Sequence, residues 1–325
     1  MKSSKYFSIF ISIILFLICS ILTPVNANAA GLYAKYAVLI DADSGRILFG
    51  NNENTAVSMA STTKIMTLII ALENCDKNFV ATTSTYAASM PDVQLNAVTG
   101  EQFIINDLFY SLMLESHNDS AVIIAENAAY YLLCKNPSLR SETPFINNYN
   151  YDSSFLSGIN HEQSKILVHI FTDLMNEKAD DILLADTYYI TPNGLDDEDN
   201  YSFHHTTAYD LYLIFNACIQ DQRFMDIISM DSYTMNLTGA DGTTRTFDVV
   251  PTNYYSSGKI NAPEGIRVFG GKTGTTDEAG CCVILYSEDL EKNPYISIIM
   301  GAEDKSFLYQ EMNRLLEAGE TTKTE

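Results

Sequence analysis

Ser61-Thr62-Thr63-Lys64 stands directly in front of the apolar run 65–72, and the rest of the chain can be ordered around this stretch. The run is too continuous for a surface helix, so it predicts a buried helix that begins near Ser61. On a helix, residues three apart share a face, which would bring the Ser61 hydroxyl beside the Lys64 amine. A serine needs a base to take its proton, and a lysine serves if burial or a neighbouring cation lowers its pKa. The spacing therefore indicates a serine nucleophile with a lysine general base.

A second cluster, Ser116-His117-Asn118, adds a hydroxyl and a carboxamide. In an extended or turn segment, side chains two residues apart point the same way, so Ser116 and Asn118 are expected to face one cleft. Ser116 could relay a proton between Lys64 and a leaving nitrogen, and Asn118 could hold a peptide group of the substrate. His117 should point away from the cleft as a structural or solvent-facing residue.

A third cluster, Lys272-Thr273-Gly274-Thr275, lies between two β-like runs. Lys272 and the Thr273 hydroxyl could pair with a terminal carboxylate. Gly274 lets another backbone approach closely, as substrate binding along an edge strand requires. The N–H of Thr275 could donate to an oxyanion, as could backbone N–H groups at the start of the Ser61 helix.

None of these clusters is specific by itself. A serine three residues before a lysine is common, and its ordinary interpretation is a capping serine beside a solvated lysine. A serine two residues before an asparagine is an ordinary loop cap. Catalysis is favoured because the three clusters occur in this order in one chain that begins with an export-like segment.

That segment, residues 1–29, is interpreted as a signal peptide. Lys2 and Lys5 precede the apolar run 7–22, and Ala27-Asn28-Ala29 supplies a cleavage site. The run is shorter than the about 20 residues of a membrane-spanning helix. An uncleaved N-terminal anchor is the alternative.

The net charge of −22 argues against binding nucleic acid or anionic lipid through the overall field. An anionic substrate would need a local cationic site. After residue 29 the cysteines are odd in number and lack the Cys-x-x-Cys spacing, which argues against a zinc site and a complete disulfide framework. Buried thiols are expected instead, and with export they suggest a Gram-positive cell. No metal or cofactor is predicted, and His204-His205 and the acidic turn 196–199 are interpreted as structural.

The order of elements predicts an α+β fold: an antiparallel sheet built from both chain ends, packed between helices, with a helical lobe. The catalytic domain is expected over 30–318, with a surface insertion at 134–162 and a polar tail at 319–325. Helices are expected at 65–72, 107–114, 119–133, 164–179, 206–220 and 307–318. Strands are expected at 36–40, 46–49, 267–269, 281–286 and 295–300.

The segments around the clusters resemble the D-alanyl-D-alanine carboxypeptidases, the low-molecular-mass penicillin-binding proteins, which carry SxxK, SxN and KTG motifs. The likeness runs from about residue 33 to about residue 301. It is carried by Ala60-Ser-Thr-Thr-Lys-Ile-Met-Thr67, Leu112-Met-Leu-Glu-Ser-His-Asn-Asp-Ser-Ala121, Met175-Asn-Glu-Lys-Ala179, Thr191-Pro-Asn-Gly-Leu-Asp-Asp197 and Gly271-Lys-Thr-Gly-Thr-Thr-Asp-Glu-Ala-Gly280.

The resemblance implies a penicillin-sensitive acyl-transfer enzyme that removes the terminal D-Ala of peptidoglycan stem peptides through an acyl-enzyme, with β-lactams as covalent inhibitors. It implies the following roles: Ser61 as nucleophile, Lys64 as base, Ser116 as proton shuttle, Asn118 at the substrate amide, and Lys272 with Thr273 at the carboxylate.

The chain departs from the family pattern at His117, where the family usually carries glycine, and in the long interval between Ser116 and Lys272. It also lacks the C-terminal β domain and anchoring helix of many members, so no C-terminal membrane anchor is expected. Two alternatives stay open. A class A β-lactamase would need a deacylating glutamate, for which 162–165 does not fit, and a wall-binding or sensor protein could have kept the pocket without turnover.

Overall fold

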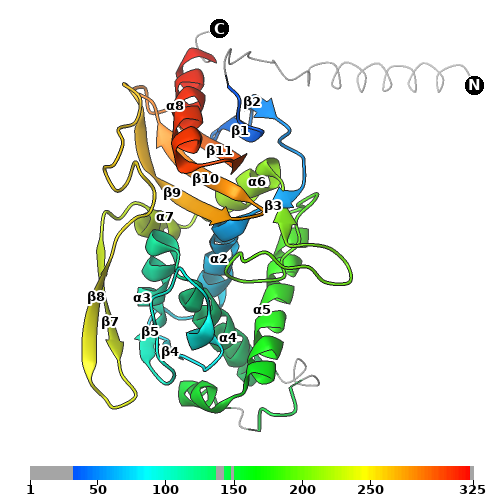
Figure 1. Cartoon of the computed structure of the whole chain (residues 1–325), viewed down its shortest axis with the longest axis vertical. Coiled ribbons are helices and arrows are strands. Elements are labelled where there is room, and N and C mark those ends of the chain that lie inside the picture. The colour runs from blue at the N-terminus through cyan, green and yellow to red at the C-terminus, as the bar shows by residue number, and fades with distance from the viewer. Residues whose placement is uncertain (1–31, 137–142, 148–149, 323–325) are drawn as a thin grey trace, which may run out of the picture.

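The structure is a computed structural model that describes residues 32–136, 143–147 and 150–322, so the predicted signal peptide lies outside it. A sheet covered by the C-terminal helix forms one end of the molecule, and a lobe of helices forms the other (Figure 1). The main sheet has five antiparallel strands in the order β2-β1-β11-β10-β9. Their bounds are β1 Tyr36–Asp41, β2 Ile47–Asn51, β9 Arg267–Thr276, β10 Gly280–Glu288 and β11 Pro294–Ala302.

The two ends of the chain meet in the middle of this sheet. Strand β1 pairs with β11 from Tyr36 opposite Met300 to Asp41 opposite Tyr295. The strands have apolar residues at successive positions because both faces of the sheet are buried. Val38 and Ile40 face the helical lobe, whereas Ala37 and Leu39 alternate to the opposite face. The predicted sheet from both chain ends is thus confirmed.

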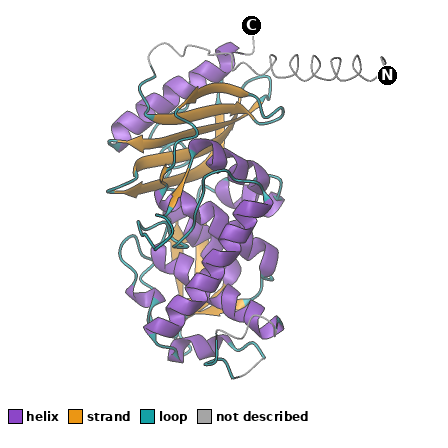
Figure 2. Ribbon diagram, turned by 90° about the vertical axis from the view of Figure 1, so that its right-hand side faces the viewer, coloured by secondary structure: helices purple, strands orange, loops and turns teal. Residues whose placement is uncertain are grey.

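Helices cover both faces of the sheet, as the sequence predicts. Helix α8 (Lys305–Thr322) packs on one face through side chains that include Leu308, Met312 and Leu315. The helical lobe packs on the other face (Figure 2). Its helices are α2 Lys64–Asn74, α3 Ile105–Tyr110, α4 Asn118–Lys135, α5 His161–Asp181, α6 Ala208–Cys218 and α7 Gln222–Ile228, with short helices η1 Ala60–Thr63, η2 Ala87–Ser89 and η5 Ser153–Gly158.

Local sequence signals account for several helix starts. Asn160 and Gln163 form a reciprocal capping box at α5, and the Thr207 side chain accepts from the Asp210 N–H at α6. The expected helix 107–114 is instead α3 followed by the π-helical turn η3 (Ser111–Glu115), which leads into the second motif.

A second sheet was not predicted. It has the strand order β4-β5-β7-β8. Its strands are β4 Val80–Thr82, β5 Gln102–Ile104, β7 Tyr233–Thr238 and β8 Thr244–Val249, and the short pair β3 Val57–Ser58 and β6 His205–Thr206 lies apart. Strand β9 is also longer than expected, so the third motif lies within a strand and not between two.

The stretch 134–162, expected as a surface insertion, contains packed residues where the structure describes it. Tyr151 lies 4.4 Å from the Phe79 ring, centroid to centroid, and Leu156 is fully buried. The cysteines of the described residues form no disulfide with one another and are buried, as expected. Within those residues, no helix has both the length and the apolar character needed to cross a bilayer.

Candidate active site

Ser61 lies in the tight turn η1, immediately before α2, with its backbone against the edge of the main sheet. The preceding residue, Ala60, has a φ of 48° in the left-handed region. The Thr63 hydroxyl donates to the Ala60 carbonyl at 2.8 Å, and the Thr62 hydroxyl donates to the Met59 carbonyl at 2.6 Å. These bonds fix a turn that presents Ser61 to the cavity while its neighbours are buried.

Lys64 has no exposed surface and donates three hydrogen bonds. Its Nζ is 2.8 Å from Ser61 Oγ, 2.9 Å from Asn118 Oδ1 and 2.5 Å from the Asn193 carbonyl oxygen. Burial lowers the pKa of Lys64 well below 10.5, and the nearby Lys272 lowers it further, while Asp119 opposes the shift. The geometry therefore places a readily deprotonated amine within hydrogen-bonding distance of the serine hydroxyl.

Ser116 is held in a left-handed conformation, with φ of 71°, at the end of the π-helical turn. Its hydroxyl accepts a hydrogen bond from Lys272 Nζ at 2.8 Å. The same ammonium group donates to the Thr273 carbonyl at 2.7 Å. Burial lowers the pKa of Lys272 to about 7. The second and third motifs are thus joined across the cavity by one buried lysine.

Asn118 is the first residue of α4, and its side chain joins Lys64 to a neighbouring loop. Its Oδ1 accepts from Lys64, and its Nδ2 donates to the carbonyls of Pro91 and Asp92, both at 3.1 Å. In this structure both motif residues reach the site, as expected from their spacing, but the Asn118 amide is directed at the 91–92 backbone. His117 is buried, which makes it structural and not solvent-facing.

Gly274 allows β9 to lie directly against the turn η1 that contains Ser61. A Cβ at this position would come within 2.7 Å of the Ser61 nitrogen and 2.9 Å of the Ala60 Cβ. These distances are shorter than van der Waals contact. Thr275 follows on β9, and its hydroxyl donates to the Gly274 carbonyl at 2.8 Å. Strand β9 is an edge strand of the sheet, so among the described residues no strand pairs with it on its outer side.

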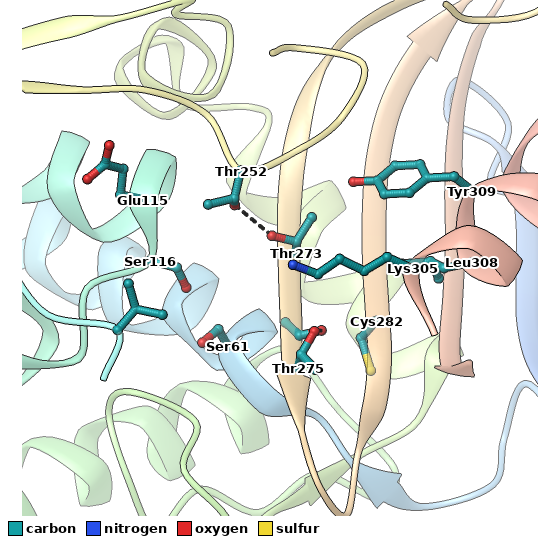
Figure 3. A pocket seen from close by; sticks show the side chains of 12 residues that line it. Ser61, Glu115, Ser116, Thr252, Thr273, Thr275, Cys282, Lys305, Leu308 and Tyr309 are labelled. Carbon is teal, nitrogen blue, oxygen red and sulfur yellow. Dashed lines mark hydrogen bonds between the residues drawn. The ribbon is translucent and has the colours of Figure 1, made fainter. Parts of the chain in front are cut away.

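The motifs line a cavity of about 150 Å³ between the helical lobe and the sheet (Figure 3). Residues that the sequence did not indicate also line it. Lys305 reaches from α8 toward Thr273, and Thr252 Oγ1 is 2.8 Å from Thr273 Oγ1 (Figure 3). Glu115 lies beside Ser116. Lys305 is the exposed first residue of α8, and no local sequence pattern marks it as a cavity residue.

His204 stabilises the turn η1 that contains Ser61, a role that the sequence did not reveal. Its Nδ1 accepts the Ile190 N–H at 3.0 Å, and its Nε2 lies 2.7 Å from Thr63 Oγ1. Burial lowers the pKa of His204 to about 3. The ring is therefore neutral, with its proton on Nε2, and donates to the Thr63 hydroxyl that in turn binds the Ala60 carbonyl.

Solved structures with this fold are DD-peptidases. The Streptomyces K15 DD-transpeptidase superimposes with a TM-score of 0.70 at 21% sequence identity, covering 89% of this chain and 97% of that chain. A D-alanyl-D-alanine carboxypeptidase of Mycobacterium tuberculosis H37Rv gives a TM-score of 0.68 at 21% identity, covering 90% and 94%. The fold is thus that of the penicillin-binding and β-lactamase-like enzymes, with the serine and two lysines at the junction of its lobes.

The chain belongs to the D-alanyl-D-alanine carboxypeptidase family, whose model matches residues 23–130 and 168–304. The unmatched interval contains the whole of the expected insertion, 134–162. Among curated relatives, D-alanyl-D-alanine carboxypeptidase DacF of Bacillus subtilis is 27% identical over 87% of this chain. The chain spans 61% of the length of that relative. A D-alanyl-D-alanine carboxypeptidase of Streptomyces sp. K15 is 25% identical over 74% of this chain and 72% of its own length.

Proposed function

We propose that this protein is a serine-type D-alanyl-D-alanine carboxypeptidase that removes the terminal D-Ala from peptidoglycan stem peptides. The observation that carries the proposal is the 2.8 Å contact between Ser61 Oγ and the fully buried Lys64 Nζ. Membership of the carboxypeptidase family supports the substrate class.

In the proposed acylation step, neutral Lys64 takes the Ser61 proton as Ser61 Oγ attacks the carbonyl carbon of the penultimate D-Ala. The backbone N–H groups of Ser61 and Thr275 stabilise the oxyanion. The C–N bond then breaks, and the proton reaches the leaving nitrogen through the Ser116 hydroxyl. Water attacks the resulting ester as Lys64 accepts its proton, the bond between the acyl carbon and Ser61 Oγ breaks, and Lys64 returns the proton to Ser61 Oγ.

We assign the terminal carboxylate to Thr273 and Lys305. Lys272 was expected to bind it, but its Nζ is buried and donates to Ser116 and Thr273. Lys272 then acts on the carboxylate through its charge, and the solvent-exposed Lys305 supplies the direct ion pair at the cavity rim. We assign two roles to Asn118: its side chain holds the backbone of residues 91–92, and it contacts the acyl side of the substrate. Gly274 keeps the edge strand close enough for the substrate to lie along it.

The test is release of D-alanine from diacetyl-L-Lys-D-Ala-D-Ala. The wild-type protein should release it, and Ser61→Ala should not, while keeping the wild-type melting temperature. Benzylpenicillin should add its mass to the wild-type protein, on the peptide that contains Ser61. A folded wild-type protein that neither releases D-alanine nor is labelled would refute the proposal.

The lifetime of that adduct separates this function from a β-lactamase. No glutamate or aspartate other than Glu115 lines the described cavity, and the Glu115 carboxylate is bonded to His117 and to the Val250 N–H. We therefore expect a long-lived penicilloyl adduct. We also propose export with cleavage after Ala29, for which the N-terminal sequence of the extracellular protein is the measurement.

A further inference from the structure

Glu115 connects the two walls of the cavity, and neither the motifs nor the proposed chemistry uses it. Its Oε2 lies 3.1 Å from His117 Nε2, and its Oε1 accepts the Val250 N–H at 3.2 Å. The hydrogen bond from His117 holds the pKa of Glu115 below its usual value. Glu115 is therefore a fixed carboxylate directly next to Ser116.

His117 is itself held on its other side. Its Nδ1 lies 2.8 Å from Ser111 Oγ, which lies 2.7 Å from Ser120 Oγ. The ring has 5% exposed surface and sits between the turn η3 and the start of α4. Both ring nitrogens thus have partners, and the imidazole cannot turn away from Glu115 without losing them.

The opposite wall is the segment Val250-Pro251-Thr252, which follows β8 and leads toward β9. Proline has no N–H, so this segment has two backbone donors. The Val250 N–H binds Glu115, and the Thr252 N–H binds the Leu114 carbonyl at 3.0 Å. Both backbone N–H groups of the segment therefore donate hydrogen bonds to residues 114 and 115. The Thr252 hydroxyl then contacts Thr273 across the rim of the cavity at 2.8 Å.

We propose that Glu115 and His117 form a clamp that fixes the distance between Ser116 and the carboxylate-binding Thr273, and so are positioning residues for acylation. This inference rests on the proposed function of the cavity. Glu115 is linked to both groups: to Ser116 by the peptide bond, and to Thr273 by the hydrogen bonds through Val250–Thr252. If the clamp opens, a bound substrate cannot place its leaving-group nitrogen at Ser116 and its terminal carboxylate at Thr273 at the same time. Small misplacements of reacting groups lower the reaction rate steeply.

The clamp predicts different outcomes for two substitutions. Glu115→Gln can keep both contacts, because the amide oxygen still accepts from Val250 and the amide nitrogen can donate to His117 Nε2. The ring then carries its proton on Nδ1 and donates to Ser111 Oγ, which donates to Ser120. Glu115→Ala loses both contacts. Glu162→Ala, at an exposed pair with Lys165 on α5, is the matched control.

The experiment compares these variants on diacetyl-L-Lys-D-Ala-D-Ala and on the same peptide with a C-terminal amide. We expect Glu115→Ala to lower kcat/KM for the free-acid peptide at least tenfold and to reduce the preference for the acid over the amide. Glu115→Gln should stay within about threefold of wild type, and Glu162→Ala should be unchanged. Wild-type kinetics in Glu115→Ala, or an equal loss in Glu115→Gln, would overturn the clamp.

Hydrogen–deuterium exchange, measured without substrate, tests the clamp independently of catalysis. The amides of Val250 and Thr252 should exchange faster in Glu115→Ala than in wild type, and not in Glu115→Gln. If the wild-type protein is not acylated at Ser61, the proposed function fails, and this measurement still decides whether the clamp joins the two walls. Unchanged exchange in Glu115→Ala refutes it.

Discussion

Two lysine side chains without appreciable exposed surface lie within one site, and the charge of Lys272 changes the protonation of Lys64. Lys64 has 0% and Lys272 has 1% of its surface exposed. Burial lowers the pKa of both, and the charge of Lys272 adds to the shift at Lys64. A general base has to be neutral before it can accept a proton, so this arrangement favours the form of Lys64 that the proposed mechanism requires.

The first prediction concerns the acid limb of the acylation rate. Removing the Lys272 charge with Lys272→Met takes away one cause that lowers the pKa of Lys64. The pKa of Lys64 should therefore rise, and the acid limb should move to higher pH, besides any loss of rate. The measurement is the pH dependence of labelling by a fluorescent penicillin. An acid limb at the wild-type position would contradict the coupling of the two lysines.

The second prediction concerns stability. The pKa of Lys272 is about 7 in the folded state against 10.5 in the unfolded chain, so the unfolded chain binds more protons between these values. Unfolding free energy from this group therefore rises with pH across that window. Buried thiols act in the opposite direction, because burial raises the pKa of Cys282 to about 12. The difference between wild type and Lys272→Met, measured by urea unfolding from pH 7 to pH 10, removes the contribution of the thiols. It contains the shift of Lys272 and its effect on Lys64, and both should move the difference in favour of wild type as pH rises.

At the level of elements, the site exists because β9 lies directly against the turn η1. Gly274 permits this contact, since a Cβ there would meet the backbone of Ser61 at 2.7 Å. We expect Gly274→Ala to push β9 and η1 apart and to lower the acylation rate at least tenfold. Gly158→Ala is the control, because a Cβ at Gly158 meets nothing within 4 Å. If penicillin labels Gly274→Ala at the wild-type rate, the close contact between β9 and η1 is not needed for acylation.

Short-range patterns were sufficient for most elements and for the three motifs. Continuous apolar runs gave the inner strands, and helical periodicity gave α5 and α8. The hairpin β7–β8 could not be predicted because β8, with residues such as Thr244 and Arg245, is largely exposed and polar. Polar strands of this kind lack the period-two apolar signal.

Three of the residues that were missed in the site share one property. Lys305, Thr252 and His204 reach it through tertiary structure, far along the sequence from the residues they contact. No local pattern marks them. The motif residues could be predicted because the spacing of Ser61 and Lys64 is set within one helical turn.

At the scale of the whole molecule, α8 fastens the start of the described chain to the sheet. Glu311 has no exposed surface, and its carboxylate accepts from the backbone N–H groups of Tyr33 and Ala34, the latter at 2.9 Å. Arg314 donates to the same carboxylate at 2.5 Å. The bonds join residues near both ends of the chain, next to the central strands.

Loss of this carboxylate should destabilise the fold without altering the chemistry. We expect Glu311→Ala to lower the unfolding free energy by about 2–4 kcal/mol, because buried donors lose their acceptor. The acylation rate of the folded protein should stay at the wild-type value. Glu317→Ala, exposed on the same helix, is the matched control for thermal and urea unfolding. Equal stabilities of the two variants would contradict this role for Glu311.

The pairing of β1 with β11 has a consequence for how the protein is made. A ribosome produces residues 36–41 long before residues 294–302, so β1 cannot pair with β11 until almost the whole polypeptide has been made. One edge of β1 can pair with β2 at once, but its other edge stays without β11 during that time, and an unpaired strand edge is a template for aggregation. A chain cut short before residue 294 would contain all three motifs but lack the strand with which β1 and β10 both pair, so we expect its main sheet not to assemble.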